Sequence, residues 1–398
     1  MWRSLAVLLV ALAGATAPAS AAVAQGSDDQ WWYVQWRMDE VRPITDGAGV
    51  TVAVLDSGVD ASLPDLSGAV VPGTNVIDGG GDGRTDLDDP GHGTVMATLI
   101  AGRGGSHGLP GVAPGATILP VIVSTGDSVD SGMAADWFEQ AIRYATDNGA
   151  HIISMSQAAR GSLQDEDGCP AALAEAVRYA ASQDVIVVAG SGNSEATASF
   201  FPGNCPGVLT VGATDQQLEP WADSHRSEYV DVTGPGVDNL LVARDGRLFQ
   251  GSGTSNATAL VSGAIALVRA AFPDESADEI LARVIHTARD IGAGGWDEAT
   301  GHGIVRPFQA LTEEVPADAP NPVWDGLDDP AQTAAPGDAT AGPDPGAALD
   351  QEGSDGSMSV AVLVAIGGIV LVLLLALGAI LAVVMISRHR PGQRPPGL

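Results

Sequence analysis

The chain contains no lysine, and its 18 basic residues are all arginines, set against 49 aspartates and glutamates. The formal net charge of the 398 residues is −31. All the acidic residues and only 14 of the arginines lie between Asp28 and Asp355, so this middle part carries about −35. Such a charge repels phosphate backbones and anionic headgroups, which argues against nucleic-acid binding and electrostatic docking on lipid. The acidity suits an exposed soluble surface, and it could also favour basic substrates.

Long hydrophobic runs are confined to the two ends of the chain. The first combines Arg3, an apolar stretch from Leu5 to Ala13 and small residues after it, which is typical of a secretory signal peptide. Ala22-Val23-Ala24 is the expected cleavage site, with Ala19-Ser20-Ala21 as the other option. An uncleaved anchor is the weaker alternative, because this apolar core is short for a membrane span.

The second run, from Val360 to Ile386, has 27 residues without a charge. At about 1.5 Å per residue, a helix of that length crosses a hydrocarbon core of about 30 Å. Arg388, Arg390 and Arg394 follow it, and positive residues stay on the cytoplasmic side. We therefore expect one membrane-spanning helix in the cell membrane, with most of the chain outside the cytoplasm.

These signals divide the chain into six parts. Residues of about 315 to 357 are rich in Pro, Ala, Asp and Gly, a composition that cannot bury enough apolar surface to fold. We predict a signal peptide at 1–24, an N-terminal extension at 25–47, a catalytic domain at 48–314, a disordered linker at 315–357, a transmembrane helix at 358–387 and a cytoplasmic tail at 388–398.

Cysteine is scarce as well, with only Cys169 and Cys205. In an exported chain, a pair of cysteines is expected to form a disulfide. A bridge of this separation contributes roughly 3–4 kcal/mol on the loop-entropy model. A catalytic thiol is a poor alternative, because neither cysteine has a histidine motif beside it.

Three short segments carry the chemistry of a serine hydrolase. They are VAVLDSGVD around Asp56, GHGTVMA around His92 and GTSNATALVSG around Ser255. A serine hydroxyl becomes a nucleophile when a base removes its proton, and an imidazole held by a carboxylate can be that base. Apolar Val52–Leu55 predicts a strand that ends on Asp56, and small residues after Ser255 predict a helix whose N-terminus lies beside the nucleophile. Singly each motif could be a solvated turn or loop, but the three together favour catalysis.

A fourth segment supplies a hydrogen-bond donor. Val185–Ala189 reads as a buried strand that leads into Gly190, Ser191, Gly192 and Asn193. An asparagine amide at a strand end can stabilise the oxyanion of a tetrahedral intermediate, and losing such a donor costs about 3–4 kcal/mol.

With these residues the chain resembles the subtilisin-like serine proteases, and among them the mycosins, membrane-anchored proteases associated with type VII secretion in actinobacteria. The resemblance covers roughly residues 30 to 312. It implies a three-layer α/β/α subtilisin-like fold with a mainly parallel sheet, to which the chain adds its C-terminal transmembrane helix. Strands are expected near Val52–Leu55, Thr117–Ile122, Ile152–Met155, Val185–Ala189 and Val208–Val211.

The resemblance also implies the site. Asp56, His92 and Ser255 correspond to the catalytic triad, and Asn193 to the oxyanion donor. The remaining substrate-binding residues implied are Ser154, Met155, Ser156, Gly190, Ser191, Gly192 and Phe200. Mycosin-like proteins commonly have a cysteine pair in the region of Cys169 and Cys205, and an N-terminal segment that packs on the catalytic domain.

Several positions depart from the family pattern. Ala259 stands where a proline is usual four residues after the nucleophile, and Ala158 and Ala159 replace usual glycines after the substrate strand. Phe200 falls where many relatives keep a small residue that lines the primary specificity pocket. We therefore expect a shallow pocket that prefers small residues.

The prediction is a membrane-anchored, extracytoplasmic serine endopeptidase that hydrolyses polypeptides through an acyl-enzyme, without a cofactor or a bound metal. A structural component of a secretion complex, with secondary or absent proteolysis, is the alternative from another class. The acidic loop from Asp78 to Asp89 could hold calcium, but a flexible solvated loop is the more frequent reading.

Overall fold

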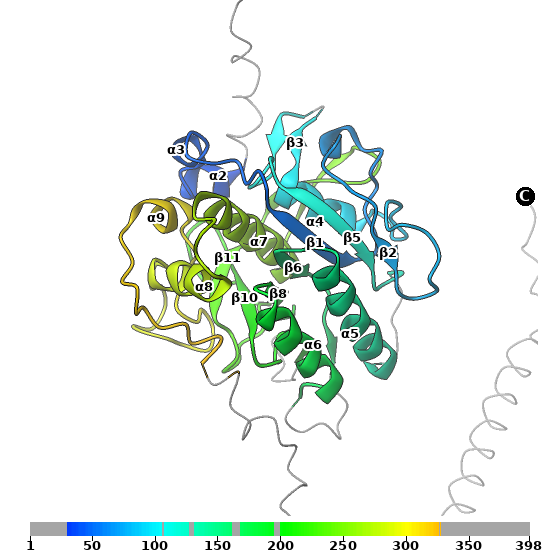
Figure 1. Cartoon of the computed structure of the whole chain (residues 1–398). Coiled ribbons are helices and arrows are strands. Elements are labelled where there is room, and N and C mark those ends of the chain that lie inside the picture. Colours follow the sequence, from blue (N-terminus) through cyan, green and yellow to red (C-terminus); the bar gives the residue numbers. More distant parts are fainter. Residues whose placement is uncertain are drawn as a thin grey trace, which may run out of the picture. The chain divides into compact units, whose positions relative to one another are not determined.

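A seven-stranded parallel sheet forms the middle layer of the computed structural model (Figure 1). Its strand order is β11-β10-β8-β6-β1-β5-β2, and each neighbouring pair is parallel. The strands are β1 (Thr51–Asp56), β2 (Thr74–Asn75), β5 (Thr117–Ile122), β6 (Ile152–Met155), β8 (Ile186–Gly190), β10 (Val208–Thr214) and β11 (Val232–Pro235). The five predicted strands are therefore present, the last of them three residues longer than expected, and β2 and β11 are additional.

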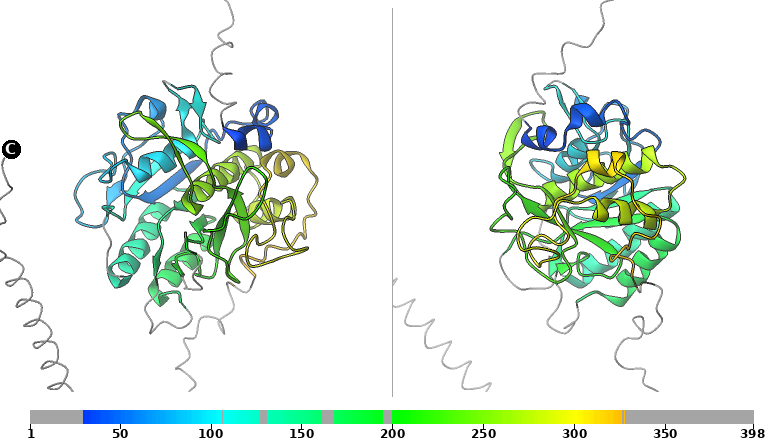
Figure 2. Two further views of the ribbon diagram at one scale, coloured as in Figure 1. Left: turned by 180° about the vertical axis from the view of Figure 1, so that it is seen from behind. Right: turned by 90° about the vertical axis from the view of Figure 1, so that its left-hand side faces the viewer.

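Helices cover both faces of this sheet (Figure 2). Along β1, Val52 and Val54 face one apolar core while Ala53 and Leu55 face the other, as the two-residue period of a strand requires. The first core contains α4 (His92–Ala101), α7 (Thr254–Ala271), α8 (Ala277–His286) and α9 (Pro307–Thr312). The second contains α5 (Ser131–Asp147) and α6 (Ala171–Ser182). This arrangement confirms the three-layer α/β/α fold.

Small residues allow α7 to run through the middle of the first core. Almost all of this 18-residue helix is buried. A Cβ atom on Gly263 would lie 2.7 Å from the Cβ atom of Val112, so only glycine permits this approach. The close packing brings the N-terminus of α7 to the carboxyl edge of the sheet, where the site lies.

Short antiparallel strand pairs lie outside the seven-stranded sheet in the described part of the chain. They are β3 (Arg103–Gly104) with β4 (Leu109–Pro110), β12 (Asn239–Val242) with β13 (Leu248–Gly251), and β7 (Ala159–Arg160) with β9 (Phe200–Phe201). A 3-10 turn, η1, spans Pro64–Leu66. The β7–β9 pair matters for function, because it joins the continuation of β6 to the segment of Phe200.

The N-terminal extension packs on the domain, as the resemblance implied. It forms α2 (Trp31–Gln35) and α3 (Met38–Val41), in which Trp32 and Met38 are fully buried. The Arg37 guanidinium lies 3.8 Å from the centre of the Phe308 ring, which ties α3 to α9.

At the other end, the folded domain runs beyond the expected boundary at residue 314. Val323 and Leu327 are buried, and the Trp324 indole N–H donates to the carbonyl oxygen of Gly207 at 3.1 Å. The predicted linker therefore begins too early. The average composition of residues 315–357 is polar, and it gave no sign of the few apolar residues, Val323, Trp324 and Leu327, that pack on the domain.

The predicted disulfide is present between Cys169 and Cys205. It joins the residues before α6 to the residues after β9, and so closes a loop that contains β8.

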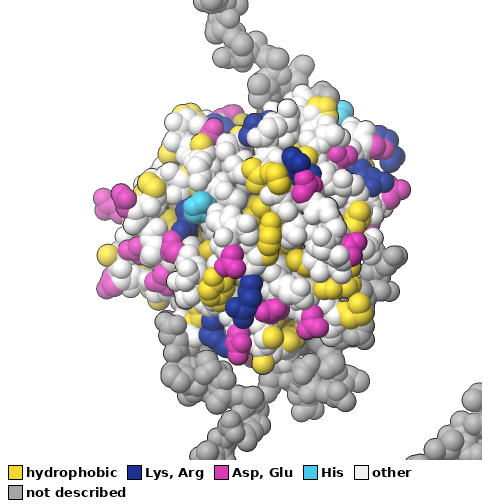
Figure 3. Space-filling view, turned by 45° about the vertical axis from the view of Figure 1, so that its right-hand side comes forward, with side chains coloured by type: hydrophobic (Ala, Val, Ile, Leu, Met, Phe, Trp, Pro, Cys, Tyr) yellow, Lys and Arg dark blue, Asp and Glu magenta, His cyan; other side chains and the backbone are white. Residues whose placement is uncertain are grey.

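The structure describes residues 30–105, 107–126, 131–160, 168–194, 200–325 and 327. The expected signal peptide, most of the expected linker, the expected transmembrane helix and the cytoplasmic tail lie outside these residues. Within them, no helix combines the length and the apolar character that a membrane span needs. On the face shown in Figure 3, acidic side chains are dispersed among apolar and uncharged ones.

Candidate active site

Asp56 and His92 lie side by side at the carboxyl edge of the sheet. Asp56 is the last residue of β1 and is buried, whereas His92 is the first residue of α4 and its side chain is 33% exposed. The Nδ1 atom of His92 lies 2.9 Å from both carboxylate oxygens of Asp56. An imidazole that donates from Nδ1 keeps the lone pair of Nε2 free, and this is the tautomer a general base needs.

Two glycines allow α4 to come this close to the end of β1. A Cβ atom on Gly93 would lie 2.1 Å from the carbonyl oxygen of Gly58 and 3.0 Å from the Cβ atom of Asp56. Gly58 itself has a φ of +104°, which disfavours other residues. A side chain at either position would separate His92 from Asp56, so the glycines of the two motifs have a steric cause.

Two aspartates of the acidic loop cap the helix that carries His92. The N-cap residue of α4 is Gly91, which has no side chain to accept a hydrogen bond. Instead, Asp88 Oδ2 accepts from the backbone N–H of His92 at 3.0 Å. Asp86 Oδ2 accepts from the backbone N–H of Thr94 at 2.8 Å and from its hydroxyl at 2.6 Å. Negative charge at a helix N-terminus is stabilising, so these carboxylates fix the first turn of α4.

Ser57 connects this capping network to Asp56. The Ser57 hydroxyl oxygen lies 2.8 Å from Asp86 Oδ1 and 3.2 Å from Asp56 Oδ1, and it accepts from the backbone N–H of Gly93 at 3.1 Å. A hydroxyl has one proton, and the shorter contact assigns it to Asp86. The backbone N–H of Ser57 donates to Asp56 Oδ1 at 2.7 Å. Ser57 thus links the two buried carboxylates, because its hydroxyl donates to Asp86 and its backbone N–H donates to Asp56.

The charges around His92 favour its protonated form. Burial alone would lower the pKa of His92, because it disfavours the imidazolium. The carboxylates of Asp56, Asp88 and Asp86 outweigh burial and raise the pKa above its ordinary value. Burial raises the pKa of the Asp86 carboxyl, and hydrogen bonds from Thr94, Asp88 and Ser57 partly offset this effect.

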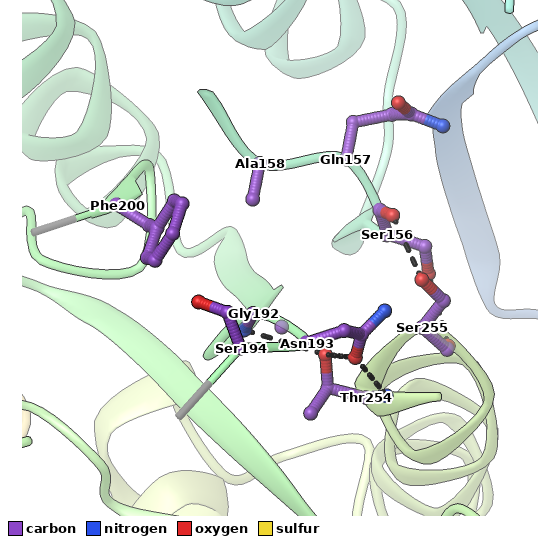
Figure 4. A pocket seen from close by; sticks show the side chains of 10 residues that line it. Ser156, Gln157, Ala158, Gly192, Asn193, Ser194, Phe200, Thr254 and Ser255 are labelled. Carbon is purple, nitrogen blue, oxygen red and sulfur yellow. Dashed lines mark hydrogen bonds between the residues drawn. The ribbon is translucent and has the colours of Figure 1, made fainter. Parts of the chain in front are cut away.

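Ser255 is the second residue of α7 and shares a cavity of about 480 Å³ with His92. Its hydroxyl donates to the carbonyl oxygen of Ser156 at 3.1 Å, and the Ser156 hydroxyl donates to the carbonyl oxygen of Ser255 at the same distance (Figure 4). Attack on a substrate requires the Ser255 hydroxyl to turn from Ser156 toward His92, since a base acts within hydrogen-bond reach.

Hydrogen bonds from Thr254 fix the orientation of the Asn193 amide. Asn193 Oδ1 accepts from the backbone N–H of Thr254 at 2.9 Å and from its hydroxyl at 2.8 Å. An amide with two donors on its oxygen must direct its NH₂ group to the opposite side. That side is the space beside Ser255 (Figure 4), so the Nδ2 protons are available there.

A second cavity, of about 270 Å³, adjoins Ser255 and is bounded by the Phe200 ring (Figure 4). Phe200 packs edge-on against His225, with ring centres 5.2 Å apart, and its backbone N–H donates to the hydroxyl of Tyr229. The described residues that line the cavity are Ser156, Gln157, Ala158, Gly190, Gly192, Asn193, Ser194, Phe200, Thr254 and Ser255. The held aromatic ring limits the depth of the cavity.

Three residues expected to bind substrate lie beneath the cleft instead. The side chains of Ser154, Met155 and Ser191 are buried, and none of the three lines either cavity. Ser154 pairs with β1 and β8, and Met155 pairs with β8, so their backbones belong to the sheet. Ser156 is the first residue of this stretch that lines a cavity.

Sequence reasoning also missed several residues of the site: Ser57, Asp86, Asp88, Gln157 and Thr254. Gln157 Nε2 lies 3.0 Å from Asp56 Oδ1, although the two residues are 101 positions apart. For the two aspartates a signal existed, because acidic residues just before a helix are typical caps. For Gln157 none existed, since its contact depends on how β6 and β1 pair.

Within the described ranges, no three His, Cys, Asp or Glu side chains come together as a metal would require. Four carboxylates of the acidic loop have hydrogen-bond partners within the protein, those of Asp78, Asp82, Asp86 and Asp88. Asp82 pairs with Arg84, and Asp78 accepts from the backbone N–H of Gly80. The loop is therefore built from local turns and from caps for α4.

The parallel sandwich, with an Asp–His pair at its carboxyl edge and a serine at a helix N-terminus beside them, defines the class of subtilisin-like serine proteases. The comparisons agree. The chain belongs to the subtilase family, which matches residues 47–303.

Among individual proteins, it is similar to mycosin-4 of Mycobacterium tuberculosis, with 34% identity over 318 residues, or 70% of this chain and 68% of mycosin-4. The structure of MycP1 from the ESX-1 type VII secretion system superposes with a TM-score of 0.65 and 29% identity, over 74% of this chain and 88% of MycP1. A chain in the structure of the periplasmic assembly from the ESX-5 inner membrane complex gives a TM-score of 0.64 and 28% identity. The match covers 82% of this chain and 90% of the ESX-5 chain. The match spans as little as 42% of one curated relative and as much as 90% of another.

Proposed function

We propose that this subtilase is a membrane-anchored, extracytoplasmic serine endopeptidase of the mycosin type in which Asp56, His92 and Ser255 form the catalytic triad. The observation that carries the proposal is convergence. Asp56 and His92 come from β1 and α4, Ser255 from α7 and Asn193 from the segment after β8. His92, Ser255 and Asn193 line two adjoining cavities, and Asp56 contacts His92.

In the first step, the Ser255 Oγ attacks the carbonyl carbon of the scissile peptide bond while its proton passes to His92 Nε2. Asp56 holds the Nδ1 proton and stabilises the imidazolium. The negative charge that develops on the carbonyl oxygen is stabilised by the Asn193 NH₂ group and by the backbone N–H of Ser255, which has no helical acceptor at this position in α7.

The tetrahedral intermediate then collapses. The carbon–nitrogen bond breaks, and the departing amine takes the proton from His92, which leaves an ester on Ser255. Water, deprotonated by the same imidazole, attacks the ester. The bond between Ser255 Oγ and the carbonyl carbon breaks, Oγ takes the proton back from His92, and the acid product leaves. No step requires a cofactor.

The substrate is a polypeptide, whose backbone can lie along Ser156–Ala158 as an added strand. The side chain before the scissile bond enters the cavity of about 270 Å³ bounded by Phe200, so small residues are preferred there. Phe200→Ala should extend acceptance to larger side chains. A wild-type cleavage profile dominated by aromatic residues at this position would refute the pocket assignment.

Residues 358–387 are proposed as the anchor and residues 388–398 as the cytoplasmic tail, with the protease domain outside. Similarity to MycP1 from a type VII secretion system and to an ESX-5 periplasmic assembly supports a secretion-complex partner. A structural role in such a complex, independent of proteolysis, is the second candidate. If the Ser255→Ala chain restores secretion, the structural role is favoured; if it does not, proteolysis is required.

Labelling with a fluorophosphonate probe tests the catalytic assignment. Wild type should be labelled, Ser255→Ala should not, and Ser182→Ala, which changes an exposed serine on α6, should match wild type. A folded wild-type protein without Ser255-dependent labelling would contradict the proposal.

A further inference from the structure

Gln157 links the substrate edge to the Asp56–His92 pair. It lies on the stretch that continues β6 and borders both cavities beside Ser255. Its side chain does not simply project into the cleft, because Nε2 lies 3.0 Å from Asp56 Oδ1 and 3.2 Å from His92 Nδ1.

The chemistry of the neighbours assigns the amide orientation. An ionised carboxylate only accepts hydrogen bonds, so the NH₂ group is the end of the amide that can face Asp56. The reversed amide would place its oxygen against Oδ1 and would compete with Asp56 for the Nδ1 proton of His92. In the donor orientation the Gln157 NH₂ group and the His92 Nδ1–H both donate to Asp56, so the 3.2 Å contact between the two nitrogens is not itself a hydrogen bond.

Gln157 also adds a hydrogen bond that holds the Asp56 carboxylate in place. Oδ1 accepts from the backbone N–H of Ser57 at 2.7 Å and from Gln157 at 3.0 Å, and it also lies 2.9 Å from His92 Nδ1. Oδ2 has one hydrogen-bond partner among the described residues, the Nδ1 atom of His92 at 2.9 Å. Both oxygens therefore face the imidazole, and the hydrogen bonds to Oδ1 from Ser57 and Gln157 keep the carboxylate from rotating out of this orientation.

We propose that Gln157 is a positioning residue of the triad, which acts by holding the Asp56 carboxylate; this inference rests on the proposed function. Its backbone belongs to the edge on which a peptide docks, while its side chain holds the buried acid. Peptide binding along this edge therefore steadies the Asp56–His92 pair, and catalysis depends on the hydrogen bond from Nε2.

The alternative is that the Gln157 side chain only lines the two cavities. A lining side chain affects substrate binding and hence KM, whereas a positioning residue affects kcat and the reactivity of Ser255 toward small reagents. Gln157→Met separates the two, because it keeps the length of the side chain and removes its donor. Gln157→Glu keeps the shape and replaces the donor with an acceptor that faces Asp56.

The experiment measures the rate constant of fluorophosphonate labelling, and kcat and KM for a peptide substrate, in purified full-length protein. Gln183→Met, an exposed glutamine at the end of α6, is the matched control. Thermal unfolding of each variant identifies any loss of folding. We expect labelling and kcat of Gln157→Met to fall about tenfold with KM nearly unchanged, a larger fall for Gln157→Glu, and wild-type values for Gln183→Met.

Labelling of both Gln157 variants within about twofold of wild type, with or without a change in KM, would overturn the positioning role while the proposed function stands. If one variant does not fold, the other decides by the same criterion. Wild type that is not labelled would overturn the proposed function and this inference together.

Discussion

Thr254→Val should slow catalysis because it releases the Asn193 amide. Asn193 Oδ1 accepts two hydrogen bonds, both from Thr254, at 2.9 Å from the backbone and 2.8 Å from the hydroxyl. The substitution removes the second, together with the acceptor of the backbone N–H of Gly192 at 3.3 Å, and keeps the shape of the side chain. A neutral hydrogen bond contributes about 1 kcal/mol net, so the ordering of Nδ2 toward the oxyanion should weaken by about that amount. We expect kcat to fall about fivefold, and KM to change little, because the oxyanion forms only in the transition state.

The effect can be assigned with a double-mutant cycle. Asn193→Ala alone should cost about 10²- to 10³-fold in kcat, because it removes the oxyanion donor itself. In that background Thr254→Val should have almost no further effect, since no amide remains to be oriented. Thr254→Ser, which keeps the hydroxyl, is the matched control and should stay near wild type. A fivefold loss for Thr254→Val in both backgrounds would refute the reasoning, because the hydroxyl would then act elsewhere.

Three further predictions concern stability and pH. Replacing Cys169 and Cys205 by alanine removes a bridge with a sequence separation of 36, which costs about 4 kcal/mol of unfolding free energy on the loop-entropy model. The midpoint of thermal unfolding should therefore fall by about 8–15 °C, and an unchanged midpoint would contradict this. Asp88→Asn keeps an acceptor for the backbone of His92 but removes a charge that raises the pKa of that imidazole, so the acidic limb of the kcat/KM profile should move to lower pH; a limb that stays in place would exclude this electrostatic role. Burial raises the pKa of Asp231 to about 7, so the folded state keeps a proton that the unfolded chain loses above about pH 4, and stability falls as the pH rises through this window. Asp231→Asn should therefore be more stable than wild type at pH 8 and similar at pH 4 in chemical denaturation, and an equal difference at both values would count against the assignment.

Much of the site could be predicted from local sequence. Asp56 ends an apolar strand, and Ser255 begins a helix of small residues. Both patterns are read within about ten positions, and both are confirmed as local structure. The Cys169–Cys205 bridge was predictable because an exported chain with two cysteines has one pairing to make.

Register and packing decided what the local sequence leaves open. Ser154 and Met155 belong to the expected strand, yet pairing on β6 commits them to the sheet and leaves Ser156 as the first accessible residue. The expected boundary at residue 314 was wrong because a few apolar residues beyond it, Trp324 among them, dock on the domain. Average composition carries no information about such docking.

The sequence by itself determined the chemical groups, their order along the chain and the alternation that buries β1 on both faces. Only the tertiary structure decided which partners these groups have. It placed Asp86 and Asp88 as caps on the helix of His92, turned the Asn193 amide by two hydrogen bonds from Thr254, and brought Gln157 onto Asp56. The physical reason is that hydrogen bonds need partners within about 3 Å, and residues distant in sequence reach that distance only through the packing of strands and helices.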